Sequence, residues 1–446
     1  MRVELKQPER FAAIFESVTG FRIHHPVLGI TTDSRECKKG DLYIAIKGKR
    51  KDGHEFLSTV TKQGSIAALV NKKNIGLNLQ QIEVENTQFT IGKIAKEWRS
   101  QFSIPVIAIT GSNGKTSTKE LLVHILSNKY NVHATEGNFN TSVGLPLTLF
   151  KMEEKHNISI LEMGANQEGD IEYLCNIAQP THGLITNISK AHLSGFGTID
   201  NITKTKGALF KSLKYGTAFV NMSDDQVASI PILGEKVTFG LTPDCDYPAD
   251  IYHENNGSLT LTVDTHEIPT GSQNISFAKN IIAVSSIAFS LGIDWKNIVI
   301  SISSFKPPDG RCKVKNIDGI TIIDDTYNAN LSSCLAALDY LNAFSDNGRR
   351  IFVFGDMFEL GDESIEQHIE VGHKCKEIEL DLVYTIGDNT KHTNSVLNNK
   401  IDSSHFESSS ELINKLKNSL QDGDKILFKG SRGMSMEKII EGVFLS

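Results

Sequence analysis

Short hydrophobic runs recur along the chain, and most are followed by glycine or polar residues and then by apolar residues at helical spacing. Short apolar runs between turn residues are typical of buried strands, and apolar positions three or four residues apart are typical of amphipathic helices. Strands that alternate with helices in this way favour parallel sheets with crossover helices. The pattern therefore predicts an α/β protein.

The same pattern divides the chain into three predicted domains, residues 1–84, 85–310 and 311–446. We expect a mostly parallel sheet in the second domain and a smaller, Rossmann-like sheet in the third. The turn at 307–310 marks the boundary between them, because Pro and Gly interrupt regular structure. The predicted strands are 29–32, 42–46, 67–70, 104–110, 158–162, 183–187, 218–221, 320–324, 350–354, 382–386 and 425–428. The predicted helices include 87–102, 119–129 and 280–291, and the serine clusters at 403–404 and 408–410 are predicted to be loops.

Composition narrows the class of protein. Of 446 residues, 39% are hydrophobic and 22% are charged, as in globular proteins. The net charge of −7 argues against a general nucleic-acid binder. Six scattered cysteines without a Cys-x-x-Cys pair favour reduced thiols over disulfides or a zinc site. The first residues lack the apolar core of a signal peptide, and the longest apolar stretch, 281–293, is too short to span a bilayer. We therefore expect a cytoplasmic protein without a membrane span.

The segment after the predicted strand 104–110 reads Gly-Ser-Asn-Gly-Lys-Thr, and a helical pattern follows it. Glycines let backbone N–H groups surround phosphate oxygens, and a helix start adds partial positive charge. Lys115 would reach the phosphates and Thr116 would bind Mg²⁺. The usual eight-residue pattern has a glycine where this chain has Ile109, so an ordinary glycine turn is the alternative. The residues predicted to bind nucleotide phosphates are Gly111, Ser112, Asn113, Gly114, Lys115, Thr116 and Ser117.

Several polar residues in the second domain allow two interpretations each. Glu162 ends a strand next to the phosphate loop, where it would bind Mg²⁺ or simply face solvent. His192 follows the next strand and is either a structural histidine or a metal ligand. Lys204 and Lys206 lie on a predicted helix, where lysines normally form a solvated face. Asn280 begins an apolar helix, so that its side chain either caps this helix or binds adenine.

Polar clusters in the third domain follow three predicted strands. Asp, Asn, Ser and Arg side chains occur in 324–330, 355–361 and 429–433, directly after the strands end. Because the carboxyl ends of parallel strands share one edge of a sheet, these clusters predict a binding edge. Arg311, beside the boundary turn, carries a guanidinium group suited to a transferring phosphoryl group.

Together these motifs resemble the Mur ligase family of ATP-dependent, amide-bond-forming enzymes of peptidoglycan assembly. The resemblance runs from about residue 31 to residue 438, with the motifs in order. Within the family, four segments are similar to the branch that joins D-alanyl-D-alanine (D-Ala-D-Ala) to UDP-N-acetylmuramoyl-tripeptide. The features shared with the whole family are Thr110-Gly-Ser-Asn-Gly-Lys-Thr116, Glu162-Met-Gly-Ala-Asn166, Asp325-x-Tyr-Asn-Ala-Asn330 and the spacing from His192 to Lys206. The four segments similar to the branch are Glu162-Met-Gly-Ala-Asn166, Ala191-His-Leu-x-Gly-Phe-Gly197, Gly355-Asp-Met-x-Glu-Leu-Gly361 and Lys429-Gly-Ser-Arg432.

The resemblance implies a role for each of the three domains. The first would be an α/β domain for the uridine nucleotide, the second a P-loop ATPase, and the third a Rossmann-like domain for the amine substrate. It also implies an ADP-forming ligase that works through an acyl phosphate, uses ATP and Mg²⁺, and is monomeric.

Site residues follow from the same resemblance. The implied catalytic residues are Lys115, Lys206, His192 and Arg311. The implied ATP ligands are the loop residues 111–117 with Asn280 at adenine, Arg311 at the γ-phosphate and Asp325 at the ribose. The implied metal ligands are Thr116, Glu162, His192 and Lys206. The implied contacts to the UDP substrate are Thr32, Asp33, Ser34, Arg35, Asn138, Asn140 and Thr141. The implied contacts to D-Ala-D-Ala are Asn328, Asp356, Met357, Glu359, Ser431 and Arg432.

The resemblance also implies that Lys206 is carbamylated by CO₂. An ammonium group has no acceptor and would repel Mg²⁺, whereas a carbamate supplies carboxylate-like oxygens. Lys206 is chosen over Lys204 by its distance from His192 along the chain.

Three other classes of protein are alternatives to this interpretation. A relative that adds a single diamino acid carries an Asp-Asn-Pro-Arg motif, which is not found here, where the corresponding region is 355–361. Folylpolyglutamate synthase lacks the uridine-binding domain. A regulatory protein that had lost catalysis would not be expected to keep Lys115, Glu162, His192, Lys206 and Arg311 together. The motifs are compatible with either diaminopimelate or lysine as the third residue of the tripeptide.

Overall fold

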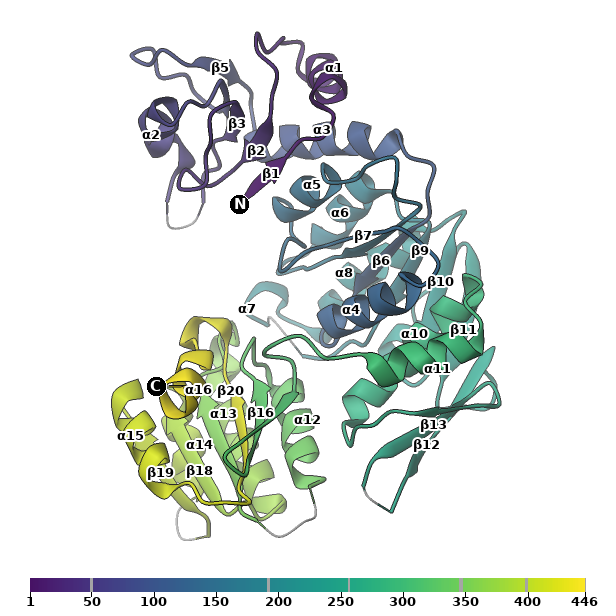
Figure 1. Ribbon diagram of the computed structural model, residues 1–446, viewed down its shortest axis with the longest axis vertical. Coiled ribbons are helices and arrows are strands. Elements are labelled where there is room, and N and C mark those ends of the chain that lie inside the picture. The colour runs from purple at the N-terminus through teal and green to yellow at the C-terminus, as the bar shows by residue number, and fades with distance from the viewer. Residues whose placement is uncertain (49–50, 191–192, 256, 345–347, 398–399, 446) are drawn as a thin grey trace.

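A computed structural model describes residues 1–48, 51–190, 193–255, 257–344, 348–397 and 400–445. Within these residues, sheets of five, nine and six strands follow one another along the chain. Figure 1 shows the N-terminal sheet at the top, the central sheet below it and the C-terminal sheet at the lower left. The α/β prediction and the three-domain order are confirmed, while the exact boundaries at 84 and 310 stay a prediction.

The N-terminal sheet has the order β1-β2-β3-β4-β5, in which only β1 is antiparallel to its neighbour among the described strands. Its strands are β1 Arg2–Glu4, β2 Gly29–Thr31, β3 Asp41–Ile44, β4 Ala67–Val70 and β5 Gln80–Glu83. Its helices are α1 Pro8–Thr19 and α2 Leu57–Lys62, and α3 Thr87–Ser100 leads into the central sheet.

The central sheet has the order β14-β13-β12-β11-β10-β9-β6-β8-β7. Pairing is parallel from β12 to β7, which places the carboxyl end of β6 between those of β8 and β9. Its strands are β6 Val106–Thr110, β7 Val132–Ala134, β8 Ile158–Glu162, β9 His182–Ile185, β10 Thr217–Asn221, β11 Glu235–Gly240, β12 Tyr247–His253, β13 Leu259–Val263 and β14 His266–Pro269. Its helices are α4 Lys115–Leu126, α5 Gly144–Leu149, α6 Asp170–Ala178, α7 Leu193–Phe196, α8 Ile199–Ser212, α9 Asp225–Ala228, α10 Ile275–Ser290 and α11 Trp295–Ser304.

The C-terminal sheet has the order β15-β16-β20-β17-β18-β19, with β15 antiparallel and the others parallel. The ends of β16, β20 and β17 are therefore neighbours, as the predicted binding edge requires. Its strands are β15 Lys313–Ile317, β16 Ile320–Asp325, β17 Arg350–Gly355, β18 Leu382–Ile386, β19 Asp402–Phe406 and β20 Lys425–Lys429. Its helices are α12 Leu331–Asn342, α13 Ser364–Glu377, α14 Thr390–Leu397, α15 Ser409–Ser419 and α16 Glu437–Phe444.

Three predictions about elements are wrong. Helix α4 begins at Lys115 and not at 119, because Gly114, in the left-handed region at φ 79°, ends the loop there. Helix α10 begins at Ile275, capped by Asn274, so Asn280 lies inside the helix and caps nothing. The serine clusters are not loops: residues 403–404 lie in edge strand β19, and Ser408 caps α15.

Strands β1, β5, β7, β11 to β15 and β19 were not predicted, and the antiparallel pairs β12–β13 and β13–β14 lie at one end of the central sheet. These strands are short or polar, or they alternate apolar with polar residues as β13 does, so they contain no continuous apolar run from which a strand could be predicted.

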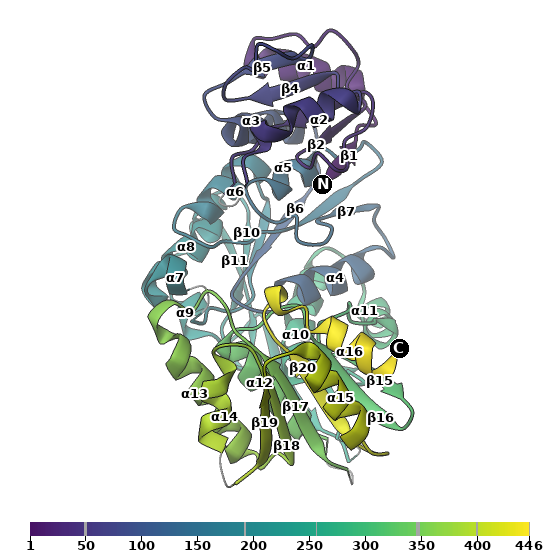
Figure 2. The ribbon, with the colours of Figure 1, turned by 90° about the vertical axis from the view of Figure 1, so that its left-hand side faces the viewer.

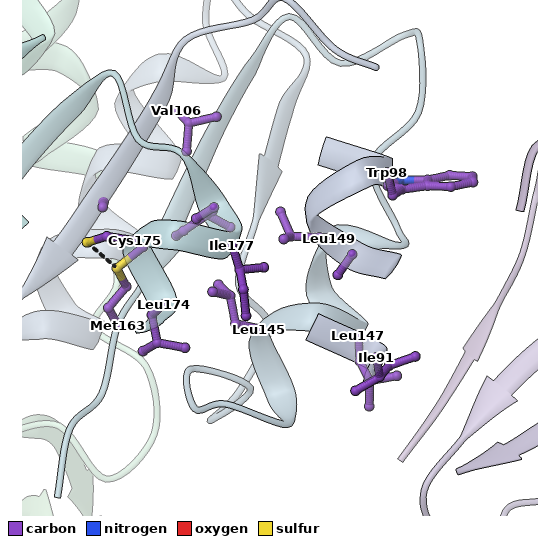
Figure 3. Close-up of a cluster of buried hydrophobic side chains, with 14 of the residues drawn as sticks. Ile91, Trp98, Val106, Leu145, Leu147, Leu149, Met163, Leu174, Cys175 and Ile177 are labelled. Atoms are coloured by element: carbon purple, nitrogen blue, oxygen red, sulfur yellow. Dashed lines mark hydrogen bonds between the residues drawn. The ribbon is translucent and has the colours of Figure 1, made fainter. Parts of the chain in front are cut away.

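One hydrophobic core joins the N-terminal sheet to one face of the central sheet. Along β6, Val106 and Ala108 face this core, whereas Ile107 and Ile109 face a second core on the other side of the sheet. Figure 3 shows Trp98 and Ile91 of α3 near the leucines of α5. The C-terminal sheet has separate cores on its two faces.

Candidate active site

The phosphate loop lies between β6 and α4 at the carboxyl edge of the central sheet. Gly111 has a φ of 145°, and a Cβ there would overlap the Thr186 hydroxyl at the end of β9. The Ser112 N–H donates to the Asn187 carbonyl at 2.9 Å, and the Thr186 hydroxyl donates to the Asn113 carbonyl at 2.6 Å. The loop is therefore held in shape by its neighbouring strand, with the α4 N-terminus behind it.

Lys115 is the first residue of α4, and its side chain folds back over the loop. Its ammonium donates to the carbonyls of Gly111 at 2.8 Å and Ser112 at 3.2 Å. Burial lowers the pKa of Lys115, the carboxylate of Glu162 opposes this change, and the charge of Arg311 adds to it. Glu162 and Arg311 thus lie close enough to Lys115 to change the pKa of its ammonium group.

Glu162 ends β8, the strand next to β6, and is 2% exposed. Its Oε1 accepts from the Asn140 side chain at 2.6 Å, and its backbone N–H donates to the Thr135 hydroxyl. Its Oε2 is buried without a hydrogen-bond partner among the described residues. A buried carboxylate oxygen left in this state fits a cation ligand, since unpaired buried charge is costly.

Lys204 and Lys206 face opposite environments on α8. The Lys206 side chain is buried, and its Nζ donates to the Gly111 carbonyl at 3.1 Å. Burial, with the charge of Lys115, sets the pKa of Lys206 well below its ordinary value. Lys204 is 63% exposed and forms an ion pair with Glu168. The helix therefore turns only Lys206 toward the phosphate loop.

Asn280 is brought to the loop from the second turn of α10. Its Oδ1 would lie 2.9 Å from a Cβ on Gly114, so the two residues are in contact range. The helix packs on α4, which follows the loop directly. A polar amide beside the phosphate loop suits an adenine contact better than the capping role that its sequence position suggested.

Arg311 links the C-terminal sheet to the loop. Its Nη2 donates to the Thr116 hydroxyl at 3.1 Å, and its guanidinium stacks 3.9 Å from the centre of the Tyr327 ring. Its Nε is buried without a hydrogen-bond partner in the part of the chain that the structure describes. An oriented guanidinium with an unused donor beside the loop fits a phosphoryl group.

The edge of the C-terminal sheet beside Arg311 holds several predicted substrate residues. Asp325 forms a buried ion pair with Lys429 and accepts from the Cys312 N–H at 3.2 Å. Asn328 and Arg432 are exposed, and the Arg432 guanidinium lies 5.9 Å from the Tyr327 ring. This edge therefore presents polar groups toward the central sheet.

The loop after β17 differs from its expected role at two positions. Asp356 is buried and accepts from the N–H groups of Asp388, Asn389 and Thr390, which anchors the start of α14. Met357 packs in the core against Cys334. These two side chains hold the loop in place.

Two other predicted residues of this edge, Glu359 and Ser431, differ in exposure. Glu359 is exposed with a φ of 63°, and its carbonyl accepts from the Ser194 N–H at 3.3 Å. The Ser431 hydroxyl is buried and accepts from the Phe358 N–H at 2.8 Å.

The predicted UDP-substrate residues do not form one cluster. Asp33 and Arg35 form a bidentate ion pair after β2, which holds the pKa of Asp33 far below its usual range. Thr32 and Ser34 lie beside them in the N-terminal domain. Asn138 and Thr141 are exposed in the central domain, whereas Asn140 is bound to Glu162.

The sequence analysis assigned no role to several residues that shape the site. Thr186 and Asn187 hold the loop, Tyr327 supports Arg311, and Asn330 contacts Asn113. Their position directly after strands was the available signal. His192 lies outside the described residues. Among the described residues, no group of three or more His, Cys, Asp or Glu side chains forms a metal cluster.

Comparison with known proteins places the chain in one family. Residues 26–99, 109–288 and 310–432 match the models of the "Mur ligase family, catalytic domain", the "Mur ligase middle domain" and the "Mur ligase, glutamate ligase domain". A UDP-N-acetylmuramoyl-tripeptide–D-alanyl-D-alanine ligase of Haemophilus influenzae is 33% identical, with 92% of each chain covered. The enzyme of that name from Escherichia coli is 31% identical, with 93% of each covered.

Solved structures agree. The crystal structure of MurF from Acinetobacter baumannii has a TM-score of 0.87 and 30% identity, with 98% of each chain covered. The MurF ligase from Thermotoga maritima in complex with ADP has a TM-score of 0.82 and 31% identity, with 93% of this chain and 97% of that chain covered. The chain belongs to the Mur ligase family.

Proposed function

We propose that this chain is an ADP-forming ligase of peptidoglycan precursor synthesis that joins D-Ala-D-Ala to UDP-N-acetylmuramoyl-tripeptide. The observation that carries the proposal is the convergence of Lys115, Lys206 and Arg311 on one phosphate loop from three elements of two domains. The activity named for the similar proteins supports the two substrates, and the ADP bound by one of them supports the use of ATP.

In the first step the terminal carboxylate of the tripeptide attacks the γ-phosphorus of ATP, and ADP leaves. The product is an acyl phosphate, which is needed because a carboxylate is a poor electrophile. Lys115 and Arg311 stabilise the charge that spreads over the phosphoryl oxygens. Asn280 contacts the adenine. Asp325, which is paired with Lys429, contacts the ribose.

The residues at the loop fit Mg²⁺. Glu162 offers a buried, unpartnered carboxylate oxygen, and Thr116 offers a hydroxyl, which are the hard ligands that Mg²⁺ prefers together with phosphate oxygens. When bound there, the ion neutralises phosphate charge. His192 would complete this set. Asn140 orients the Glu162 carboxylate, a role we prefer to the substrate contact first expected for it.

Lys206 is suited to carbamylation. It is buried without a carboxylate partner in the described residues, and its environment favours the neutral amine. The amine lone pair forms an N–C bond with CO₂, and one proton leaves to solvent, which gives an anionic carbamate. This change replaces the neutral amine beside Lys115 with an anionic oxygen ligand.

In the second step the amine of D-Ala-D-Ala attacks the acyl phosphate carbonyl, and inorganic phosphate leaves. Asn328, Glu359 and Arg432 are the accessible predicted residues for this dipeptide. Ser431, Asp356 and Met357 position the surrounding loop. Holding both reactants in line supplies on the order of 7–11 kcal/mol of the barrier.

The UDP end of the other substrate is assigned to Thr32, Asp33, Ser34 and Arg35, with Asn138 and Thr141 along its path to the loop. No helix in the described part of the chain is long and apolar enough to cross a membrane. We further propose a cytoplasmic location, where nucleotide-linked precursors are made, and a monomeric enzyme.

A phosphate-release assay tests the proposed function. Release is expected only when ATP, UDP-N-acetylmuramoyl-tripeptide and D-Ala-D-Ala are all present, because the acyl phosphate needs both substrates to turn over. Single D- or L-amino acids in place of the dipeptide serve as controls. Equal turnover with a single amino acid would assign the chain to another reaction within the family, and release without substrates would contradict the ligase assignment.

Lys115→Ala tests the role of the loop in the same assay. The variant is expected to release no ADP while it binds UDP-N-acetylmuramoyl-tripeptide with nearly unchanged affinity by calorimetry, since the proposed ligand of Lys115 is the phosphate of ATP and not the UDP substrate. Unchanged turnover in Lys115→Ala would contradict the assignment of this loop as the ATP phosphate site.

A further inference from the structure

Four side chains connect the phosphate loop to the C-terminal domain. Asn113 Nδ2 donates to the Ser332 hydroxyl at 2.7 Å, and Asn330 Nδ2 donates to Asn113 Oδ1 at 2.8 Å. The hydroxyls of Ser189 and Ser332 lie 2.9 Å apart. We call these four residues the interdomain cluster. All four are half-buried, so their hydrogen bonds are partly shielded from water.

Asn113 is fixed by its backbone on the nucleotide side of this cluster. Its N–H donates to the Asn187 side chain at 3.1 Å, and its carbonyl accepts from Thr186 and Asn187. It stands between Gly111 and Gly114, which shape the loop around phosphate. A change in loop shape would therefore move the Asn113 side chain directly.

On the other side, the cluster is part of the start of α12. The Asn330 side chain caps the helix by accepting from Ser333 N at 2.9 Å, while its amide group donates to Asn113. Tyr327, three residues before, carries the Arg311 guanidinium on its ring. Asn330, the helix end and the support of Arg311 therefore form one short, rigid segment.

We propose that Asn330 and Ser332 are positioning residues that couple the shape of the phosphate loop to the placement of the C-terminal domain. The shape of the nucleotide-binding loop would then set the alignment of the amine substrate. This inference rests on the proposed function, because it assigns a role within that reaction. Asn330 and Ser332 contact neither nucleotide nor dipeptide in this scheme and act through Asn113 and α12.

Ser332→Ala tests the coupling because it removes the hydroxyl that bonds to Asn113, Ser189 and Asn330 Oδ1, while the bond from Ser333 N–H to Asn330 that caps the helix stays. We expect kcat/KM for D-Ala-D-Ala to fall about 10-fold, as for the loss of half-buried neutral hydrogen bonds, with the melting temperature nearly unchanged. Ser332→Thr keeps the hydroxyl and should restore most of the lost rate. A double-mutant cycle with Asn113→Ala should be non-additive.

Ser333→Ala is the matched control, one residue along the same helix. It breaks the capping box of α12, so it should lower the melting temperature while leaving kcat/KM near the wild-type value.

A second readout is the radius of gyration with ADP by X-ray scattering, which should be larger for Ser332→Ala than for the wild type.

Three results would overturn the coupling: wild-type kinetics in Ser332→Ala, effects that multiply independently with Asn113→Ala, or equal kinetic losses in Ser332→Ala and Ser333→Ala. Failure of the proposed function looks different, because the wild-type chain itself would then form no product from the two substrates.

Discussion

At the scale of single residues, the site depends on which side chains the fold desolvates. Lys204 and Lys206 are two positions apart, yet one forms an exposed ion pair and the other reaches the loop carbonyl of Gly111. A buried amine without a carboxylate partner is chemically different from an exposed ammonium. This difference explains why only one of the two lysines is suited to carbamylation.

Replacement of these lysines should separate their roles. Lys206→Ala is expected to lower kcat by about 100-fold or more, since the loss of a group that holds or orients a metal has effects of at least this size. Lys204→Ala should stay within about 2-fold, because an exposed ion pair contributes little. Phosphate release measures both, and labelled ¹³CO₂ should give a carbamate NMR signal that Lys206→Ala lacks. Wild-type turnover in Lys206→Ala would contradict the assignment.

His133 makes the stability of the protein depend on pH. Burial lowers the pKa of His133 to about 4, and its ring nitrogens contact the Ser159 hydroxyl and the Thr148 carbonyl. The unfolded chain, with a pKa near 6.5, binds the proton more readily below that pH. The contribution of His133 to the free energy of unfolding is therefore complete above about pH 6.5. It falls by about 3 kcal/mol as the pH decreases toward 4.

His133→Gln removes that titration. Urea unfolding of both proteins from about pH 7 to pH 4 should show a smaller loss of stability in the variant, even if its stability at pH 7 is lower. Parallel curves for the two proteins would show that His133 does not carry this pH dependence.

At the scale of elements, helix starts decide what the side chains near them do. Asn274 caps α10 by accepting from the Phe277 N–H at 3.1 Å, whereas Asn280 lies in the second turn beside Gly114. The same residue type thus has a structural role at one position and a proposed binding role six residues later. The two roles differ because α10 begins at Ile275, more than one turn before its apolar run starts at Ile281.

Alanine at these two asparagines should have opposite effects. Asn274→Ala is expected to cost about 1 kcal/mol of stability through the lost cap and to leave KM for ATP unchanged. Asn280→Ala should change stability by less than about 0.5 kcal/mol and raise KM for ATP about 10-fold. Thermal unfolding and steady-state kinetics check both. A large stability loss in Asn280→Ala would return this residue to a structural role.

At the scale of the whole molecule, the three domains are joined in two different ways. The N-terminal and central domains share one hydrophobic core, in which Phe150 lies 5.4 Å from Phe11 and 6.0 Å from Trp98 between ring centres. The C-terminal domain has its own cores and meets the central domain through polar contacts such as Arg311 with Thr116. Figure 2 shows it at the far end from the N-terminal sheet. Polar junctions of this kind permit domain motion.

Calorimetry of the full chain should reflect this arrangement as two transitions. Phe150→Ala is expected to destabilise the N-terminal and central domains together by about 3–5 kcal/mol and to leave the C-terminal transition in place. Phe352→Ala, in the C-terminal core, should do the reverse. If Phe150→Ala separated the first two domains into distinct transitions, the shared core would not be cooperative.

The sequence predicted most of the elements that carry chemistry. The strand before the phosphate loop, the strand that ends in Glu162 and the three neighbouring strand ends of the C-terminal sheet all lie where expected. The sequence interpretation overlooked β1, β5, β7, β11 to β15 and β19, and it misplaced the starts of α4 and α10. Alternating strands carry a weak apolar signal, and a helix start depends on a cap and not on the first apolar residue.

The sequence by itself determined the alternation of strands and helices, the phosphate loop and the residues at the ends of the predicted strands, because these follow from local periodicity and turn chemistry. Only the tertiary structure decided which of those residues meet. Arg311 reaches Thr116, Asn330 reaches Asn113 and Asn140 holds Glu162. Such contacts arise when packed helices and sheets fix side chains that are distant in the chain, and local patterns carry no information about that packing.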